Sequence, residues 1–372
     1  MFISDGMKRL IKYVPRACVH KKEARRMQNV RFTQLSMKRG CIKVSSIREV
    51  AKRANVSPAT VSRVMNGTAN VDPEKRERVL QAIKETGFVP NEVARSLFKK
   101  SAKIIGLVIP SIENPFFTHM ASAIENEAEA NGYRVVLYNT DSDFEKEKAA
   151  LQMLSAMNAD GIILTRIDEK LLPYVEATNI PAVITDSCFL GGKDITYIDS
   201  DHYQGGRLAA EHLIECGCRK IVCVRGVQTI ASARARFLGY RDVCKEYGLE
   251  ECTIECSYDF HDGLQAAEEL LQKYPDVDGI VASNDMVAIS IYKVLTKHNI
   301  KVPEQIQLIG FDDIELSSII TPELSTIKQS VKEIGKKATD IIISNKENKS
   351  EENNHILSVK LVMRETTRLK SN

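Results

Sequence analysis

The sequence lacks the features that define several classes of protein. Its 372 residues contain no apolar run of the ~20 residues that a membrane-spanning helix needs. The N-terminus is basic but has no apolar segment like that of a secretory signal, so we expect a cytoplasmic protein. The dinucleotide, phosphate-loop, hydrolase and metalloprotease motifs GxGxxG, GxxxxGKS/T, GxSxG and HExxH are also missing. We therefore expect neither an enzymatic activity nor a cofactor.

The cysteines do not form a recognisable framework. There are nine, an odd number, with no CxxC pair and no histidine at zinc-finger spacing. This pattern fits buried thiols in a reducing cytoplasm. Cys216-x-Cys218 and Cys252-x3-Cys256 are spaced closely enough to share a metal, but neither belongs to a larger ligand set, so we expect no metal site.

Charge is distributed unevenly along the chain. Residues 1–43 carry twelve Lys and Arg against two acids, and residues 44–100 carry eleven against six. The remaining residues have a net charge of −12, which leaves a total of +3. A basic N-terminal segment followed by an acidic remainder indicates that a polyanionic partner binds near the N-terminus. The alternative is a solvated basic tail.

Local patterns divide the chain into four parts. Residues 1–43 show no sustained period and are expected to be a disordered extension, followed by a helical headpiece at 44–90 and a connecting segment at 91–100. Ser46 and Asp72-Pro73 open helices, and Gly87 ends one. From residue 101, continuous β-rich runs alternate with helix-length segments, which predicts an α/β fold with two doubly wound parallel sheets. The polar segment Lys346–His355 is expected to be a surface loop.

The headpiece contains a helix-turn-helix pattern. In IREVAKRANVSPATVSRVMNG, one helix ends near Ala54 and the next begins at Pro58. Small residues at the start of the second helix let it enter a major groove, where Arg63 can reach a guanine and polar side chains can hold phosphates. The alternative is a small helical bundle with a solvated polar face.

This string resembles the helix-turn-helix of the lactose/galactose (LacI/GalR) repressor family. The likeness continues through VDPEKRERVLQAIKETGFVPNEVARSLFKK, which is similar to the family's third helix and hinge. The resemblance implies a homodimer on a pseudo-palindromic operator in double-stranded DNA, with a hinge leucine wedged into the minor groove. The DNA-contacting residues that it implies are Ser46, Arg48, Ser57, Pro58, Ala59, Thr60, Ser62, Arg63, Asn66, Asn91, Ala94, Arg95 and Leu97.

Polar and aromatic residues follow the expected strands of the body. Ligands bind beyond the carboxyl ends of strands in open α/β sheets, and amides, carboxylates, Arg and Phe suit the hydroxyls and apolar face of a sugar. The same Asn and Asp residues are also common helix N-caps, so both interpretations stay open. His202 and His261 are expected to be surface or capping residues.

The body resembles periplasmic sugar-binding proteins and the repressors related to them, especially ribose-operon repressors of Gram-positive bacteria. The resemblance rests on NPFF, SARARFLGY, SND, GFDDIE and STIKQ. It implies a small sugar effector, ribose, bound between a subdomain of about 101–200 plus 329–355 and one of about 201–328 plus 356–372. The effector-binding residues that it implies are Asn114, Phe116, Phe117, Asp168, Arg236, Phe260, Asn284, Asp312 and Gln329, with Asp285 and Asp313 as supports. The alternative within the family is a regulator whose corepressor is a phosphorylated carrier protein.

Overall fold

A computed structural model shows two separate units, residues 1–90 and 91–372. It describes residues 46–65, 67, 71–88, 101–187, 195–345 and 354–368. The expected extension and connecting segment lie outside the described residues, as do five expected DNA contacts: Asn66, Asn91, Ala94, Arg95 and Leu97.

The described part of the N-terminal unit contains three short helices: α1 (Ile47–Ala54), α2 (Pro58–Met65) and α3 (Pro73–Thr86). The Ser46 side chain accepts a hydrogen bond from the Glu49 amide, and Asp72 caps α3 in the same way. Asn55 and Gly87 adopt left-handed conformations that end α1 and α3. A small core of Val and Ala side chains from all three helices holds the unit together.

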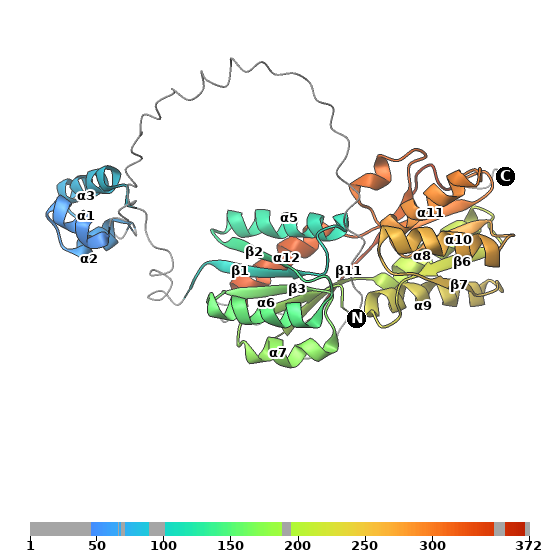
Figure 1. Ribbon diagram of the computed structural model, residues 1–372, viewed down its shortest axis with the longest axis horizontal. Helices are drawn as coiled ribbons and strands as arrows, with labels where there is room; N and C mark the ends of the chain where they lie inside the picture. The colour runs from blue at the N-terminus through green and yellow to red at the C-terminus, as the bar shows by residue number, and fades with distance from the viewer. Residues whose placement is uncertain are drawn as a thin grey trace, which may run out of the picture. The chain divides into compact units, whose positions relative to one another are not determined.

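The first subdomain of the body is a sheet covered by helices on both faces (Figure 1). Its strands lie in the order β11-β5-β4-β3-β1-β2, and all their pairings are parallel. Helices α5 and α12 pack on one face and α6 and α7 on the other. The strands are β1 (Ile104–Ile109), β2 (Arg134–Asn139), β3 (Gly161–Thr165), β4 (Ala182–Thr185), β5 (Ile195–Ser200) and β11 (Asn354–Leu357). The helices are α5 (Pro115–Ala130), α6 (Phe144–Ala156), η2 (Glu169–Leu171), α7 (Leu172–Ala177) and α12 (Val331–Asn345).

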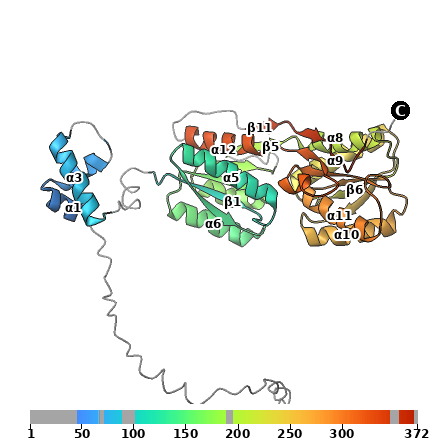
Figure 2. The same ribbon diagram turned by 90° about the horizontal axis from the view of Figure 1, so that it is seen from above.

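The second subdomain repeats this layering, as Figure 2 shows from above. Its strands lie in the order β12-β10-β9-β8-β6-β7, parallel except for β12. Helices α8 and α9 share one face, and α10 and α11 share the other. The strands are β6 (Ile221–Arg225), β7 (Cys252–Glu255), β8 (Gly279–Ala282), β9 (Gln307–Asp312), β10 (Ser325–Lys328) and β12 (Lys360–Val362). The helices are α8 (His202–Glu215), α9 (Ala231–Glu246), α10 (Phe260–Lys273), α11 (Asp285–Lys297) and η3 (Glu315–Ser318).

The chain passes between the two sheets after β5, after β10 and after β11. The third crossing differs from the sequence-based expectation. Asn354 and His355, expected to end a surface loop, begin β11, which stays in the first sheet until Leu357. Because β11 pairs in parallel with the carboxyl half of β5, the boundary between the first and the second subdomain lies about two residues beyond residue 355.

The described cysteines are six buried thiols, all in the second subdomain. Burial raises the pKa of Cys218 to about 12, which keeps this thiol protonated and unreactive. Within the described ranges, no cluster of three His, Cys, Asp or Glu side chains is arranged to hold a metal ion. None of the helices in the same ranges has the length and apolarity needed to cross a membrane.

Candidate functional site: a polar cleft and a helix-turn-helix

The expected DNA-reading helix, α2, is exposed along one side. Val61 and Val64 are buried in the small core, whereas Ser57, Pro58, Ala59 and Arg63 are exposed. The Ser57 side chain accepts a hydrogen bond from the Thr60 amide at 3.2 Å and so caps the helix. On α1, Ser46 and Arg48 are also exposed. The packing of α1, α2 and α3 thus leaves the start of α2 available to a groove.

In the body, Arg236 of α9 is the centre of a buried polar cluster. Its guanidinium donates to the Ser283 carbonyl at 2.7 Å and to Nδ1 of His202 at 3.2 Å. It also lies 3.6 Å from Oδ1 of Asp312, which accepts a hydrogen bond from Gln329 at 2.8 Å. These side chains come from different elements, so the fold and not a local motif brings them together.

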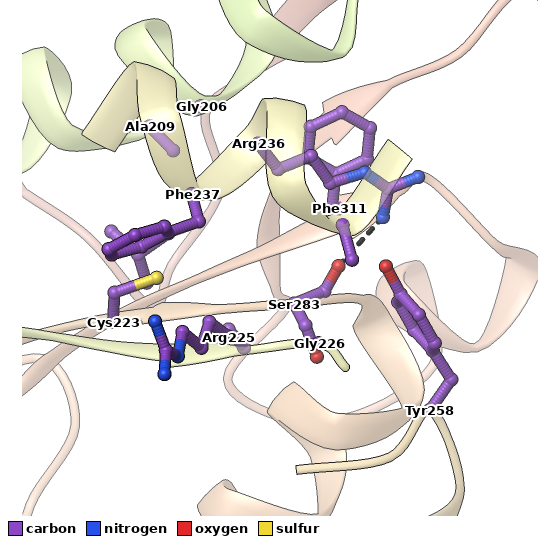
Figure 3. A pocket seen from close by; sticks show the side chains of 13 residues that line it. Gly206, Ala209, Cys223, Arg225, Gly226, Arg236, Phe237, Tyr258, Ser283 and Phe311 are labelled. Atoms are coloured by element: carbon purple, nitrogen blue, oxygen red, sulfur yellow. Dashed lines mark hydrogen bonds between the residues drawn. The ribbon is translucent and has the colours of Figure 1, made fainter. Parts of the chain in front are cut away.

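Aromatic rings flank this cluster. The Arg236 guanidinium lies 3.7 Å from the centre of the Phe311 ring (Figure 3). In the same view the Tyr258 hydroxyl points toward the guanidinium, and a dashed line joins Arg236 to Ser283. The pocket extends to Ala209, Cys223 and Phe237, where the Arg225 guanidinium lies 4.9 Å from the centre of the Phe237 ring. The second subdomain therefore places the Arg236 guanidinium beside the rings of Phe311 and Tyr258. This arrangement suits a polar ligand that also has an apolar side.

The first subdomain contributes a second buried guanidinium. Arg166, directly after β3, donates from Nε and Nη2 to one oxygen of Asp186 at 3.0 and 2.7 Å. Its guanidinium lies 5.0 Å from the Phe117 ring and 4.5 Å from the Tyr258 ring. Because Tyr258 belongs to the second subdomain, Arg166 joins the two halves of the cleft.

Burial and charge set the protonation of the acids in the cleft. Burial raises the pKa of Asp312 to about 7, although Arg236 opposes this shift. For Asp186, burial also raises the pKa, but Arg166 and His202 outweigh it and hold the pKa well below its usual range. The cleft thus combines a fixed carboxylate with one that exchanges its proton near neutral pH.

Two buried hydroxyls in the cleft, those of Tyr258 and Ser283, have no hydrogen-bond partner within the described residues. An unsatisfied buried polar group costs ~1–3 kcal/mol, so both hydroxyls are available to hydrogen-bond a water molecule or a ligand.

The structure brings together only part of the expected effector set. Arg236, Asp312 and Gln329 form the cluster, and Phe116 lines a groove with Asp312 and Gln329. Phe117 is buried beneath Arg166.

Three other expected ligands act as helix caps. Asn114, Asp168 and Asn284 accept amide hydrogen bonds at the starts of α5, η2 and α11. Asp168 is exposed. Among the residues that follow β3, it is Arg166 whose side chain lies in the cleft, where it pairs with Asp186. Phe260, the first residue of α10, contacts Lys293 on α11, and Tyr258 faces the cleft in its place.

Sequence reasoning missed other members of the cluster. His202, expected at the surface or in a cap, is buried with 2% of its surface exposed. Asp186 directly follows β4, so the rule that ligand groups follow strands was signal enough to find it. Phe311 lies within β9, and an aromatic residue inside a buried strand is predicted from the sequence to belong to the hydrophobic core. Asp285 supports the site as expected, because its carboxylate accepts from the Ile314 amide and from Ser317 and Thr326.

The two units match two family models. Residues 46–91 match the bacterial regulatory proteins of the lacI family. Residues 102–365 match the periplasmic binding proteins and sugar binding domain of the LacI family. The chain therefore belongs to the LacI family: it is a sugar-responsive, DNA-binding repressor and not an enzyme.

Individual relatives agree with this assignment. The chain is 39% identical to a "Ribose operon repressor" of Halalkalibacterium halodurans, over 87% of this chain and 98% of the relative. A structure of the lac repressor dimer bound to operator and the anti-inducer ONPF superimposes with a TM-score of 0.79 at 29% identity, over 87% of this chain and 99% of that one. A periplasmic binding protein/LacI regulator from Alkaliphilus metalliredigens, complexed with D-xylulofuranose, gives 0.66 at 34% identity, over 72% and 99%.

Proposed function

We propose that this repressor responds to ribose, or to a closely similar pentose, bound between the two body subdomains. The observation that carries the proposal is the buried fork of Arg236, set between Asp312 and the Phe311 ring. The relative named as a ribose operon repressor and the regulator crystallised with a five-carbon sugar support this ligand class.

The chemistry of the cleft fits a small neutral sugar. A guanidinium and a carboxylate each present two polar atoms in one plane, which matches neighbouring hydroxyls of a sugar ring. The Tyr258 ring can cover the C–H face, and the unpaired hydroxyls of Ser283 and Tyr258 can complete the remaining hydrogen bonds. The positive charges of Arg166 and Arg236 face Asp186 and Asp312, so the ligand need not carry charge.

The sugar acts on DNA binding through the relation between the two subdomains. We propose that a homodimer binds a pseudo-palindromic operator, with Arg63 and the start of α2 in the major groove and Leu97 at the hinge. Sugar bound between the subdomains changes their relative rotation and so the placement of the hinge segments. A ligand can shift this equilibrium only by its differential affinity, and ~1–3 kcal/mol of coupling gives ~5–150-fold in operator affinity.

Thermal unfolding of the full chain with a panel of sugars and sugar phosphates tests the proposal. Ribose at ~100 times its dissociation constant adds ~2.7 kcal/mol to the free energy of unfolding, which raises the melting temperature visibly. Operator binding with and without the active sugar then shows the response. A panel in which ribose gives no shift while another sugar does contradicts the ribose assignment.

A phosphorylated protein as corepressor is the second candidate. The groove between α5 and α12 is lined by Lys328, Lys332 and Lys336, which could contact a phosphate, but also by the acids Glu127, Asp312, Asp313 and Glu333. Lys328 also pairs with Asp313 and Lys336 with Glu127, so two of these charges are partly neutralised. If no free sugar stabilises the protein, a pull-down with phosphorylated carrier protein tests this candidate.

A further inference from the structure

His202 lies where the chain first crosses between the subdomains. It is the first residue of α8, two residues after β5 ends at Ser200, and only 2% of its surface is exposed. Helices α8 and α9 approach closely because Gly206 and Gly239 have no side chain. A Cβ at Gly206 would lie 2.0 Å from the Arg236 carbonyl oxygen, and one at Gly239 would lie 2.2 Å from that of Tyr203. This close packing places the His202 ring beside Arg236.

The two ring nitrogens of His202 face different subdomains. Nδ1 accepts the Nε–H of Arg236 at 3.2 Å within the second subdomain. Nε2 lies 3.3 Å from Oδ1 of Asp186, which follows β4 in the first subdomain. Both atoms are buried, and neither has another hydrogen-bond partner among the described residues. A relative movement of the subdomains would change the distance between them.

The ring is neutral and its tautomer follows from its neighbours. Burial lowers the pKa of His202, and the charges of Arg236 and Arg166 lower it further, against the opposing effect of Asp186. Since Nδ1 accepts from Arg236, the single proton lies on Nε2 and points toward Asp186. The rigid His202 ring therefore carries an acceptor for Arg236 at Nδ1 and a donor for Asp186 at Nε2.

We propose that His202 is a positioning residue that holds Arg236 for the sugar through Nδ1 and, through Nε2 and Asp186, couples Arg236 to the relative placement of the two subdomains. This inference rests on the proposed function of the cleft. A polar chain of Arg166, Asp186, His202, Arg236 and Asp312 then runs without interruption from one subdomain to the other.

Two amide substitutions separate the roles of the two nitrogens. In His202→Asn, the amide oxygen takes the place of Nδ1 and can accept from Arg236, but nothing reaches Asp186. In His202→Gln, the amide nitrogen takes the place of Nε2 and can donate to Asp186, but the acceptor for Arg236 is lost. His212→Asn is the matched control, because His212 is a buried histidine of the same helix whose Nε2 pairs with Thr367.

The measurements are the ribose dissociation constant by calorimetry and the ratio of operator affinities with and without saturating ribose. We expect His202→Gln to weaken ribose binding by ~10-fold or more. We expect His202→Asn to bind ribose within ~3-fold of the wild type but to lose most of the ribose-dependent change in operator affinity. The His212→Asn control leaves both unchanged. Equal loss of ribose affinity in the two His202 variants, or no effect in either, overturns the proposal.

A further measurement needs no variant and no ligand. Nitrogen-15 NMR of the histidine-labelled wild type at pH 7 is expected to show His202 protonated at Nε2 only. Protonation at Nδ1 overturns the proposed link to Arg236. A wild type without any ribose response instead contradicts the proposed ribose function, while the NMR result still decides the arrangement around His202.

Discussion

Replacing Arg236 by alanine is the sharpest test of the cleft. The substitution removes the donor to the Ser283 carbonyl and to His202, and it leaves Asp312 without its nearest positive charge. It also removes the group that lies against the Phe311 ring. Three buried acceptors from separate elements lose a partner at once, so both stability and ligand binding are expected to change.

The contacts set the expected size of the effect. Breaking a buried charge pair by removing one partner costs ~3–5 kcal/mol. Asp312, with a pKa of about 7, takes up a proton readily once Arg236 is gone, which reduces this cost. We therefore expect the body to lose ~2–4 kcal/mol. In the proposed complex the Arg236 guanidinium donates two charge-assisted hydrogen bonds to ribose, each ~1.5–3 kcal/mol, so we expect their loss to weaken ribose binding by at least ~100-fold.

Calorimetry with ribose, thermal unfolding and operator titration measure these effects separately. Operator affinity without sugar is expected to stay within ~3-fold of the wild type, while the response to ribose disappears. Arg241→Ala is the matched control on the same helix, because its side chain is 43% exposed and pairs with its neighbour Asp242 at the surface. A ribose dissociation constant of the Arg236 variant within ~3-fold of the wild type would refute the reasoning.

Three further predictions address the hinge, the helix packing and the titration of the cleft. Leu97→Ala is expected to weaken operator binding and leave ribose binding intact; unchanged operator affinity in titration would remove the minor-groove wedge. Gly239→Ala forces α8 and α9 apart and should lower stability by ~1–3 kcal/mol and weaken ribose binding, measured by thermal unfolding and calorimetry; a wild-type melting temperature and ribose affinity would argue against tight helix packing. Burial raises the pKa of Asp312 to about 7, so the folded chain keeps a proton that the unfolded chain releases. Without sugar, the wild type should therefore lose stability relative to Asp312→Asn as pH rises from 5 to 7, by at most ~1.4 kcal/mol per unit, and then level off. A constant difference in melting temperature across this range would show that Asp312 stays ionised beside Arg236.

Local signals predicted the building blocks well. Ser46, Asn55, Asp72 and Gly87 act through their own side chains or backbone on residues a few positions away, so the limits of the headpiece helices could be found from the sequence. The β-rich runs of the body predicted parallel strands for the same reason, since burial on both faces leaves a continuous apolar run. Strands β11 and β12 carry no such run, because Asn354 to Leu357 and Lys360 to Val362 are half-exposed edge segments.

The members of the cleft depend on longer distances. Asn114, Asp168 and Asn284 fit the rule that ligand groups follow strands, yet the same side chains cap the next helix, and the sequence does not separate the two uses. Tyr258 and Phe260 are two residues apart at the end of one strand. Only the start of α10 decides that Phe260 faces α11 and Tyr258 faces Arg166.

The sequence by itself determined the family, the helix-turn-helix and the two-sheet body, and it nominated Arg236 and Asp312 among nine effector residues, because contiguous motifs carry this information. The tertiary structure alone decided that Arg166, Asp186 and His202 complete the cleft. These residues lie on three segments, and their contacts depend on where the chain crosses between the sheets and on how closely Gly206 and Gly239 let α8 and α9 pack. Such convergence is a property of packing in space, which no local pattern of residues encodes.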